Sequence, residues 1–155
     1  MNKKYLEIYN NLVNLTTNKN LYSNLDKQDT FSDRLSLFLM HFAFLLKNFK
    51  SDENEKKLQE LYDFNFRQIE LSIREIGYGD QSINKKMKDY INLFHSIISD
   101  IHFWNSKNFE DKKKIITKFL ANFDNFDILT EYFVKFDDNL SKKTLNSYLK
   151  SVIND

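Results

Sequence analysis

The chain has 155 residues, 18.7 kDa and a net charge of +1, so it has the length of one ordinary domain and no overall attraction to nucleic acid. It contains no Cys, which excludes disulfides, thiol redox chemistry and thiolate metal sites. Only 2 Gly and no Pro occur, where average usage would give about eleven and about eight. The Gly-rich phosphate-binding loops of Rossmann and P-loop enzymes are therefore excluded, and we predict an all-α fold of about six or seven helices in a single domain over 1–155.

Apolar residues recur at helical spacing along the chain. The predicted helices span about 3–15, 30–49, 51–76, 80–101, 108–123, 125–136 and 141–153. The polar segment 16–27 still contains apolar residues, so we expect a packed loop there rather than a free linker. Asp29 and Thr30 are good N-cap residues for the second helix, and Thr30 with Asp33 resembles a capping box.

The second predicted helix is apolar around most of its circumference. Such a helix lies at the centre of a core or presents an exposed apolar face. Among the 15 Phe of the chain, Phe38, Phe42 and Phe44 on this helix form a groove for an apolar client in one interpretation. In the other, the abundance of Phe reflects AT-rich codons and these rings are core.

Both glycines lie in one corner between the third and fourth helices, over 74–80. Gly77 is placed as a left-handed C′ residue, Gly79 allows a close approach, Asp80 caps the next helix, and Arg74 pairs with a nearby carboxylate. A tight structural corner explains this arrangement, and so does a docking edge, because charged loop residues on rigid scaffolds often carry binding.

Three lysines, Lys85, Lys86 and Lys88, begin the fourth helix close to Arg74. Cations at a helix N-terminus oppose the helix dipole, so they are not placed there for helix stability. This pattern favours a partner such as ribosomal RNA, anionic lipid or an acidic protein, while a solvated polar face is the alternative.

Later in the chain, Asn108 with Asp111 predicts the start of the fifth helix, and Trp104 is expected to be a packing anchor. The three histidines, His41, His95 and His102, lack the i,i+3 or i,i+4 spacing of a metal site, so we expect no metal and no cofactor.

Catalytic carboxylates are not expected either. Asp63, Arg67 and Glu70 have the spacing of an ion-pair ladder along one helix face, which is a simpler explanation than an acid–base pair. We therefore predict no catalytic residue.

Three motifs, in this order, resemble the ubiquinol–cytochrome c chaperone family. Residues 29–34, D-T-F-S-D-R, are similar to the family's D-T-x-x-G-R, and residues 61–67, L-Y-D-F-N-F-R, to its L-F-D-x-x-F-R. Residues 72–80, S-I-R-E-I-G-Y-G-D, resemble L-R-E-M-G-V-G-D, and 85–88 resemble its basic K-x-M-K start of a helix. The chain departs from the family at Asp33, which stands in place of Gly, and at 94–96, where many members have F-Y-G-R.

The resemblance, which covers about residues 5–123, implies a non-enzymatic assembly factor. Mitochondrial members escort newly made cytochrome b to the respiratory cytochrome bc1 complex, with a small partner protein and near the ribosome exit. The partners implied are thus cytochrome b or another bc1 subunit, a ribosome or small partner protein, and a membrane surface, but no DNA. The glycine corner and the basic helix start, together with the resemblance, predict a partner-binding set of Arg74, Glu75, Gly77, Gly79, Asp80, Lys85, Lys86 and Lys88. The family-motif residues with a structural role are Asp29, Thr30, Arg34, His41, Asp63, Phe66 and Met87.

The expected location is the cytoplasm, including the inner face of the membrane. The N-terminus, Met1–Leu6, has no apolar stretch behind its lysines, and the longest apolar run, Phe42–Leu46, is far shorter than the roughly 20 residues of a membrane span. The missing transit peptide favours a bacterial origin. Two other classes remain open: a general interaction scaffold without a respiratory client, and a small helical metal-binding enzyme.

Overall fold

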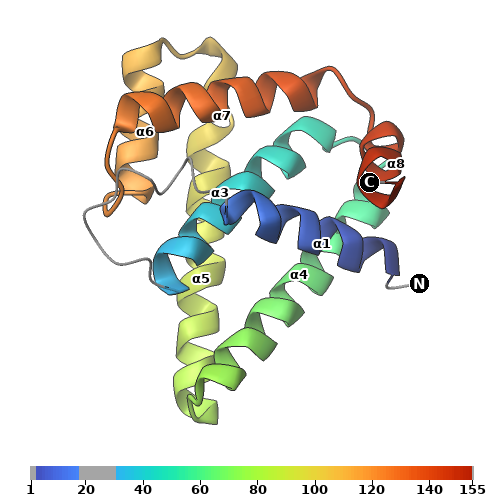
Figure 1. Cartoon of the computed structure of the whole chain (residues 1–155), viewed down its shortest axis with the longest axis vertical. Helices are drawn as coiled ribbons and strands as arrows, with labels where there is room; N and C mark the ends of the chain where they lie inside the picture. Colours follow the sequence, from blue (N-terminus) through green and yellow to red (C-terminus); the bar gives the residue numbers. More distant parts are fainter. Residues whose placement is uncertain (1–2, 18–30, 155) are drawn as a thin grey trace.

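The computed structural model describes residues 3–17 and 31–154, and these form seven α-helices and one 3-10 helix (Figure 1). The helices are α1 (Lys3–Thr16), α3 (Phe31–Phe49), α4 (Glu55–Ile76), α5 (Asp80–Ile101), η1 (Trp104–Ser106), α6 (Phe109–Phe119), α7 (Phe126–Ser141) and α8 (Leu145–Asn154). The predicted all-α fold is confirmed. Asp29 and Thr30, the expected caps of the second helix, lie outside the described residues.

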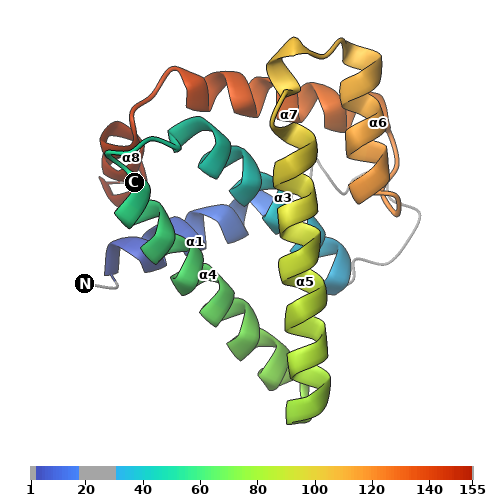
Figure 2. The same cartoon turned by 180° about the vertical axis from the view of Figure 1, so that it is seen from behind.

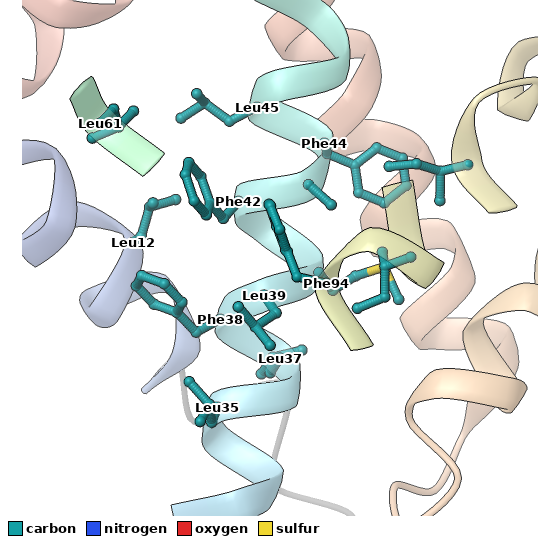
Figure 3. Packing of buried hydrophobic residues seen from close by; sticks show 14 of the residues in the cluster. Leu12, Leu35, Leu37, Phe38, Leu39, Phe42, Phe44, Leu45, Leu61 and Phe94 are labelled. Carbon is teal, nitrogen blue, oxygen red and sulfur yellow. The ribbon is translucent and has the colours of Figure 1, made fainter. Parts of the chain in front are cut away.

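Helix α3 is the central helix of the fold. It packs against α1, α5 and α7, and every residue from 37 to 45 is buried (Figure 3). The side chains of Phe38, Phe42 and Phe44 are only 4%, 0% and 0% exposed, so the expected groove on this helix is wrong. Neighbouring helices cover α3 on several sides, which explains why its sequence is apolar around most of the helix.

Two polar contacts join α3 to α7 within this core. Lys47 Nζ lies 2.9 Å from a carboxylate oxygen of Asp137, and the side-chain amide of Asn48 donates to the same oxygen at 2.8 Å. Asp137 is buried, so its charge is stabilised by these two donors rather than by water.

Trp104 is the packing anchor that the sequence predicted. It is buried in η1, and its ring meets Phe44 edge-on with 4.9 Å between the ring centres. The short turn after α5 therefore closes the end of the core next to α3.

The first and last described helices pack against each other. Helix α1 contacts α3, α4 and α8. Tyr148 Oη of α8 donates to Asn11 Oδ1 of α1 at 2.8 Å, and Tyr5 Oη of α1 donates to the carboxylate of Glu60 in α4. In both views of the fold α1 crosses α4, in front of it in Figure 1 and behind it in Figure 2.

Helices α4 and α5 form a long antiparallel hairpin that points away from α7 (Figures 1 and 2). The two helices meet at the corner 77–79 and diverge toward the rest of the fold. Helix α5 contains the whole predicted apolar stripe from Ile83 to Ile101, whereas α4 begins at Glu55 rather than at residue 51. Residues 51–54 form a turn in which the backbone N–H of Asn54 bonds to Ser51, so the acidic residues there precede the helix.

Helices α6 and α8 begin with side-chain caps, whereas Asn125 at the start of α7 makes no side-chain cap bond. Asn108 accepts from the backbone N–H of Asp111 at 2.9 Å, as predicted. Helix α6 then ends at Phe119 rather than near 123, and α7 continues to Ser141 rather than ending near 136. Helix α8 starts at 145 rather than 141, because Thr144 and Ser147 exchange reciprocal backbone-to-hydroxyl hydrogen bonds of 3.0 Å each.

Within the described part of the chain, no helix combines the length and the apolar character that crossing a bilayer requires.

Candidate functional site

The corner between α4 and α5 is built on one left-handed glycine. Gly77 has φ of 105°, and its N–H donates to the carbonyl of Arg74 at 3.0 Å, which closes the end of α4. Gly79 has an extended backbone with φ of −74° and ψ of 165°, and a Cβ added to it would meet nothing within 4 Å. The expected close approach at Gly79 is therefore wrong.

Asp80 does not cap α5, contrary to the prediction. Gly79 occupies the N-cap position and Asp80 is the first helical residue. The Asp80 carboxylate instead accepts a hydrogen bond of 2.8 Å from Arg74, which spans the corner from the last turn of α4. The predicted pairing of Arg74 with a carboxylate is thus confirmed, and it links the last turn of α4 to the first residue of α5.

A chain of alternating charges runs along this edge of the hairpin. Glu70 accepts from Arg67 at 2.8 Å and lies 3.7 Å from Arg74, which reaches Asp80. The hydrogen bond to Asp80, with the nearby negative charges, raises the pKa of Arg74. Arg74 is thus a partnered cation at the corner. Asp63 accepts from Gln59 at 3.0 Å rather than from Arg67, so only the second half of the expected Asp–Arg–Glu ladder is present.

The three lysines of α5 do not gather on one face. Successive residues of a helix are turned by about 100°, so Lys86 and Lys88 point in nearly opposite directions, while Lys85 and Lys88 lie on neighbouring positions. Lys86 Nζ lies 4.5 Å from the centre of the Tyr78 ring, a cation–π contact that ties α5 to the corner. Within residues 3–17 and 31–154, neither Lys85 nor Lys88 forms an ion pair.

An open groove of about 540 Å³ lies between α4 and α5. Phe66, Met87 and Ile91 are its apolar lining residues. Its polar rims are Asp63, Arg67 and Glu70 on α4 and Asn84, Lys88 and Asn92 on α5. The groove is hence an apolar strip with polar or charged side chains along both edges.

The hairpin brings together motif residues that are far apart in sequence. Asp63 and Phe66 come from one family motif and Met87 from another, and all three line the groove beside Lys88. The sequence singled out these four residues but not their neighbours Asn84, Ile91 and Asn92. These three residues could have been found from the sequence, because they lie three or four positions from Met87 or Lys88 and so share a helix face with them.

Aromatic side chains join α4 to α5 on the side of the groove away from the corner. Tyr62 Oη lies 3.1 Å from His95 Nε2, and the Phe66 ring lies 4.7 Å from the Tyr62 ring and 5.4 Å from the Phe94 ring. Partial burial raises the pKa of Tyr62. This packing holds Phe66 in place beneath the groove.

Three of the remaining predicted site residues lie outside the groove. Glu75 is exposed on the last turn of α4. Arg34, in the first turn of α3, lines a separate hollow of about 300 Å³ among α1, α3 and α4. His41 is fully buried between α3 and α7, so it belongs to the core.

No cluster of three or more His, Cys, Asp or Glu side chains that could hold a metal ion occurs among residues 3–17 and 31–154. The two exposed histidines of α5 and its C-terminal cap, His95 and His102, lie two helical turns apart and share no carboxylate partner in the described part of the chain. The hairpin combines a corner closed by Gly77, an apolar strip and exposed charged side chains.

A family model described as Ubiquinol-cytochrome C chaperone matches residues 23–101, just over half of the 155-residue chain. Comparison with curated proteins and with solved structures gave no match. The matched region ends at the last residue of α5, so it contains the complete α4–α5 hairpin and its groove. The chain belongs to the ubiquinol–cytochrome c chaperone family.

Proposed function

We propose that this protein is a non-enzymatic chaperone that binds newly made cytochrome b and assists assembly of the respiratory cytochrome bc1 complex. The observation that carries the proposal is the family match over 23–101, which contains the open groove lined by the motif residues Asp63, Phe66 and Met87. A protein that only binds can still direct assembly, because binding one state of a client stabilises that state by mass action.

The α4–α5 hairpin is the docking surface in this proposal. The residues involved are Arg74, Glu75, Gly77, Gly79, Asp80, Lys85, Lys86 and Lys88, together with the groove. Within this set, Arg74 and Asp80 hold the shape of the corner, while Lys85 and Lys88 supply exposed positive charge. Ile76 and Tyr78, which are 52% and 43% exposed, add apolar contact area at the tip.

The proposed partners follow from the same surface. Cytochrome b, or another bc1 subunit, is the client. The ribosome, a small partner protein and the inner face of the membrane are the further contacts that would bring the chaperone to its client during synthesis. The exposed lysines suit each of them, because ribosomal RNA, anionic lipid and acidic proteins all carry negative charge.

The test is crosslinking and affinity purification of the tagged chain from its native cells, followed by mass spectrometry. We expect enrichment of cytochrome b, and we expect the double variant Lys85→Glu with Lys88→Glu to reduce both this enrichment and the amount of assembled bc1 complex. That pair is preferable to a change at Arg74, since the loss of Arg74 would also break the contacts that shape the corner.

A matched control reverses the same amount of charge at Lys135 of α7 and Lys150 of α8, which are exposed and lie away from the corner (Figure 1). The control should retain client and complex at wild-type levels. If unrelated soluble proteins are enriched while bc1 subunits stay at background level, the proposed client is wrong and a general interaction scaffold is favoured. Unchanged client binding in the double variant would contradict the proposed docking role of the hairpin.

A further inference from the structure

We propose that the groove between α4 and α5 binds a short amphipathic helix of a protein partner, with acidic residues along the side of that helix that faces Lys88 and Lys85. This inference rests on the proposed function and specifies the kind of segment that the docking surface recognises. It excludes a fully apolar transmembrane helix as the occupant of the groove.

The apolar strip consists of one residue of α4 and two residues of α5. Phe66 is buried at its base, while Met87 and Ile91, one helical turn apart on α5, are half-buried and remain accessible. An unbranched Met side chain adapts to irregular partners, which is why methionine is frequent at binding surfaces. A partner ridge with apolar residues at i, i+3 or i+4, and i+7 fits this strip.

The length of the groove sets the length of the partner segment. Its lining residues run from Asp63 to Glu70 on α4 and from Asn84 to Asn92 on α5. With a rise of about 1.5 Å per residue, these stretches are about 10 and 12 Å long. A helix of two to three turns covers this distance.

The two rims differ in charge. On α4, the cation Arg67 is paired with Glu70, and Asp63 contacts only the neutral Gln59, so the lining residues of this rim include no unpaired cation. On α5, Lys88 stands between two asparagines and has no ion pair within the described residues, and Lys85 lies one turn away. Charge complementarity therefore places the acidic side of the partner against α5.

The polar rims also argue against a transmembrane occupant. Of the nine lining residues, six are polar or charged: Asp63, Arg67, Glu70, Asn84, Lys88 and Asn92. A uniformly apolar helix would desolvate these groups without offering them hydrogen bonds or opposite charges. An amphipathic helix leaves the rims hydrated or paired while it covers Phe66, Met87 and Ile91.

The test uses two synthetic helical peptides of about twelve residues and the full-length chain. Both peptides carry the same leucine and alanine stripe, and one is flanked by Glu and the other by Lys. Fluorescence anisotropy at low ionic strength is expected to show saturable binding of the Glu-flanked peptide, at least about tenfold tighter than that of the Lys-flanked peptide. This preference should decrease with added salt, because exposed charges are screened.

Three variants locate the binding. Met87→Arg should abolish binding of both peptides, Lys88→Glu should remove or reverse the charge preference, and Lys135→Glu should bind as the wild type does. Circular dichroism confirms that each variant is folded. The proposal is overturned if the Glu-flanked peptide shows no saturable binding to the wild type, if Met87→Arg binds it equally well, or if Lys88→Glu leaves the preference unchanged.

The outcome is separable from that of the proposed function. If the peptides bind with the expected preference but the affinity purification contains no cytochrome b, the groove assignment is supported and the proposed client is wrong. Cytochrome b enrichment from wild-type cells, together with no peptide binding, would leave the client standing and move its docking site elsewhere on the molecule.

Discussion

At the scale of single residues, His41 is a buried and neutral histidine. Its Nδ1 donates to the carbonyl of Leu37 at 2.8 Å, so Nε2 is the nitrogen that accepts from Tyr132 Oη at 2.6 Å. Burial lowers the pKa of His41 to about 4, which the hydrogen bond to Leu37 only partly offsets. The side chain thus joins α3 to α7 as a neutral imidazole.

The His41 environment predicts a stability that decreases in mild acid. Because the folded-state pKa is lowered below 6.5, the stabilising contribution is present above pH 6.5 and is lost as the pH falls toward 4. Between pH 7.5 and pH 5 this group should lower the free energy of unfolding by about 2 kcal/mol. Urea unfolding at the two pH values measures the difference.

Two variants separate His41 from the other titrating groups. His41→Gln should reduce the difference between the two pH values, because glutamine does not titrate. His102→Gln, at an exposed histidine, should leave it in place. An equal pH dependence in wild type and His41→Gln would contradict the assignment.

Asn65 is a buried polar residue whose side-chain amide has no hydrogen-bond partner within the described structure. An unpaired buried amide costs about 1–3 kcal/mol relative to a paired one. We expect Asn65→Leu, which has a similar shape, to raise the free energy of unfolding by about 1 kcal/mol, and Asn65→Ala to gain less because it leaves a cavity. Destabilisation by Asn65→Leu in chemical unfolding would show that the amide is paired in solution.

The surroundings of single residues could not be predicted from the sequence. The burial of His41, for example, depends on rings from α7, which is far away in the chain. The separation of Lys86 from Lys88 was predictable from the helical period alone. Their adjacency in sequence suggested one basic cluster that the helix does not form.

At the scale of elements, the two glycines of the α4–α5 corner differ in backbone conformation. Gly77 has a left-handed backbone that an L side chain occupies only with strain, while Gly79 has a backbone that any residue adopts. Gly77→Ala should therefore lower the free energy of unfolding by about 1–2 kcal/mol. Gly79→Ala should change it by no more than about 0.5 kcal/mol, because the reduced freedom of the unfolded chain is offset by the lower preference of Ala for an N-cap position.

Thermal unfolding of the two single variants side by side measures this contrast. Both positions have open space around a new Cβ, so backbone conformation is the difference being tested. Equal losses at the two positions would mean that the corner is constrained by something other than the left-handed residue.

Elements with clear end signals were predicted best. The start of α5 lies within one residue of the prediction because Gly77 ends the preceding helix just before it. The start of α8 was missed because its cap is a Thr–Ser pair rather than a residue followed by Glu or Gln. For α3, periodicity could not separate a central helix from one with an exposed face, because both are apolar all round.

At the scale of the whole molecule, the groove is a product of tertiary packing. Its residues come from two helices whose crossing is set by the corner and by the aromatic contacts among Tyr62, Phe66 and Phe94. The motif residues could be identified in the sequence, but no local sequence pattern predicts the distance between two packed helices along their length. This is why Asp63, Phe66 and Met87 could be named as candidates but not joined into one site.

The family-matched region depends on the rest of the chain for its core. Phe44 of α3 is stacked on Phe133 of α7 at 5.5 Å and meets Trp104 of η1 at 4.9 Å, and both partners lie outside 23–101. We expect a fragment of residues 23–101 to lack a cooperative thermal transition in circular dichroism, whereas the full chain unfolds cooperatively. A sharp transition in the fragment would show that α1, η1 and α6–α8 are accessory to the fold.

The pairing of α1 with α8 has a consequence for the order in which the fold can be completed. Tyr148 and Asn11 are 137 positions apart, so their hydrogen bond closes a loop that spans nearly the whole chain. During translation α1 is synthesised before α8, so the contact between the two helices cannot form until α8 has been made. Contacts of such long sequence separation form late in folding. The matched helices α3–α5 can associate while the ends of the chain are still apart, and the pairing of α1 with α8 then completes the fold.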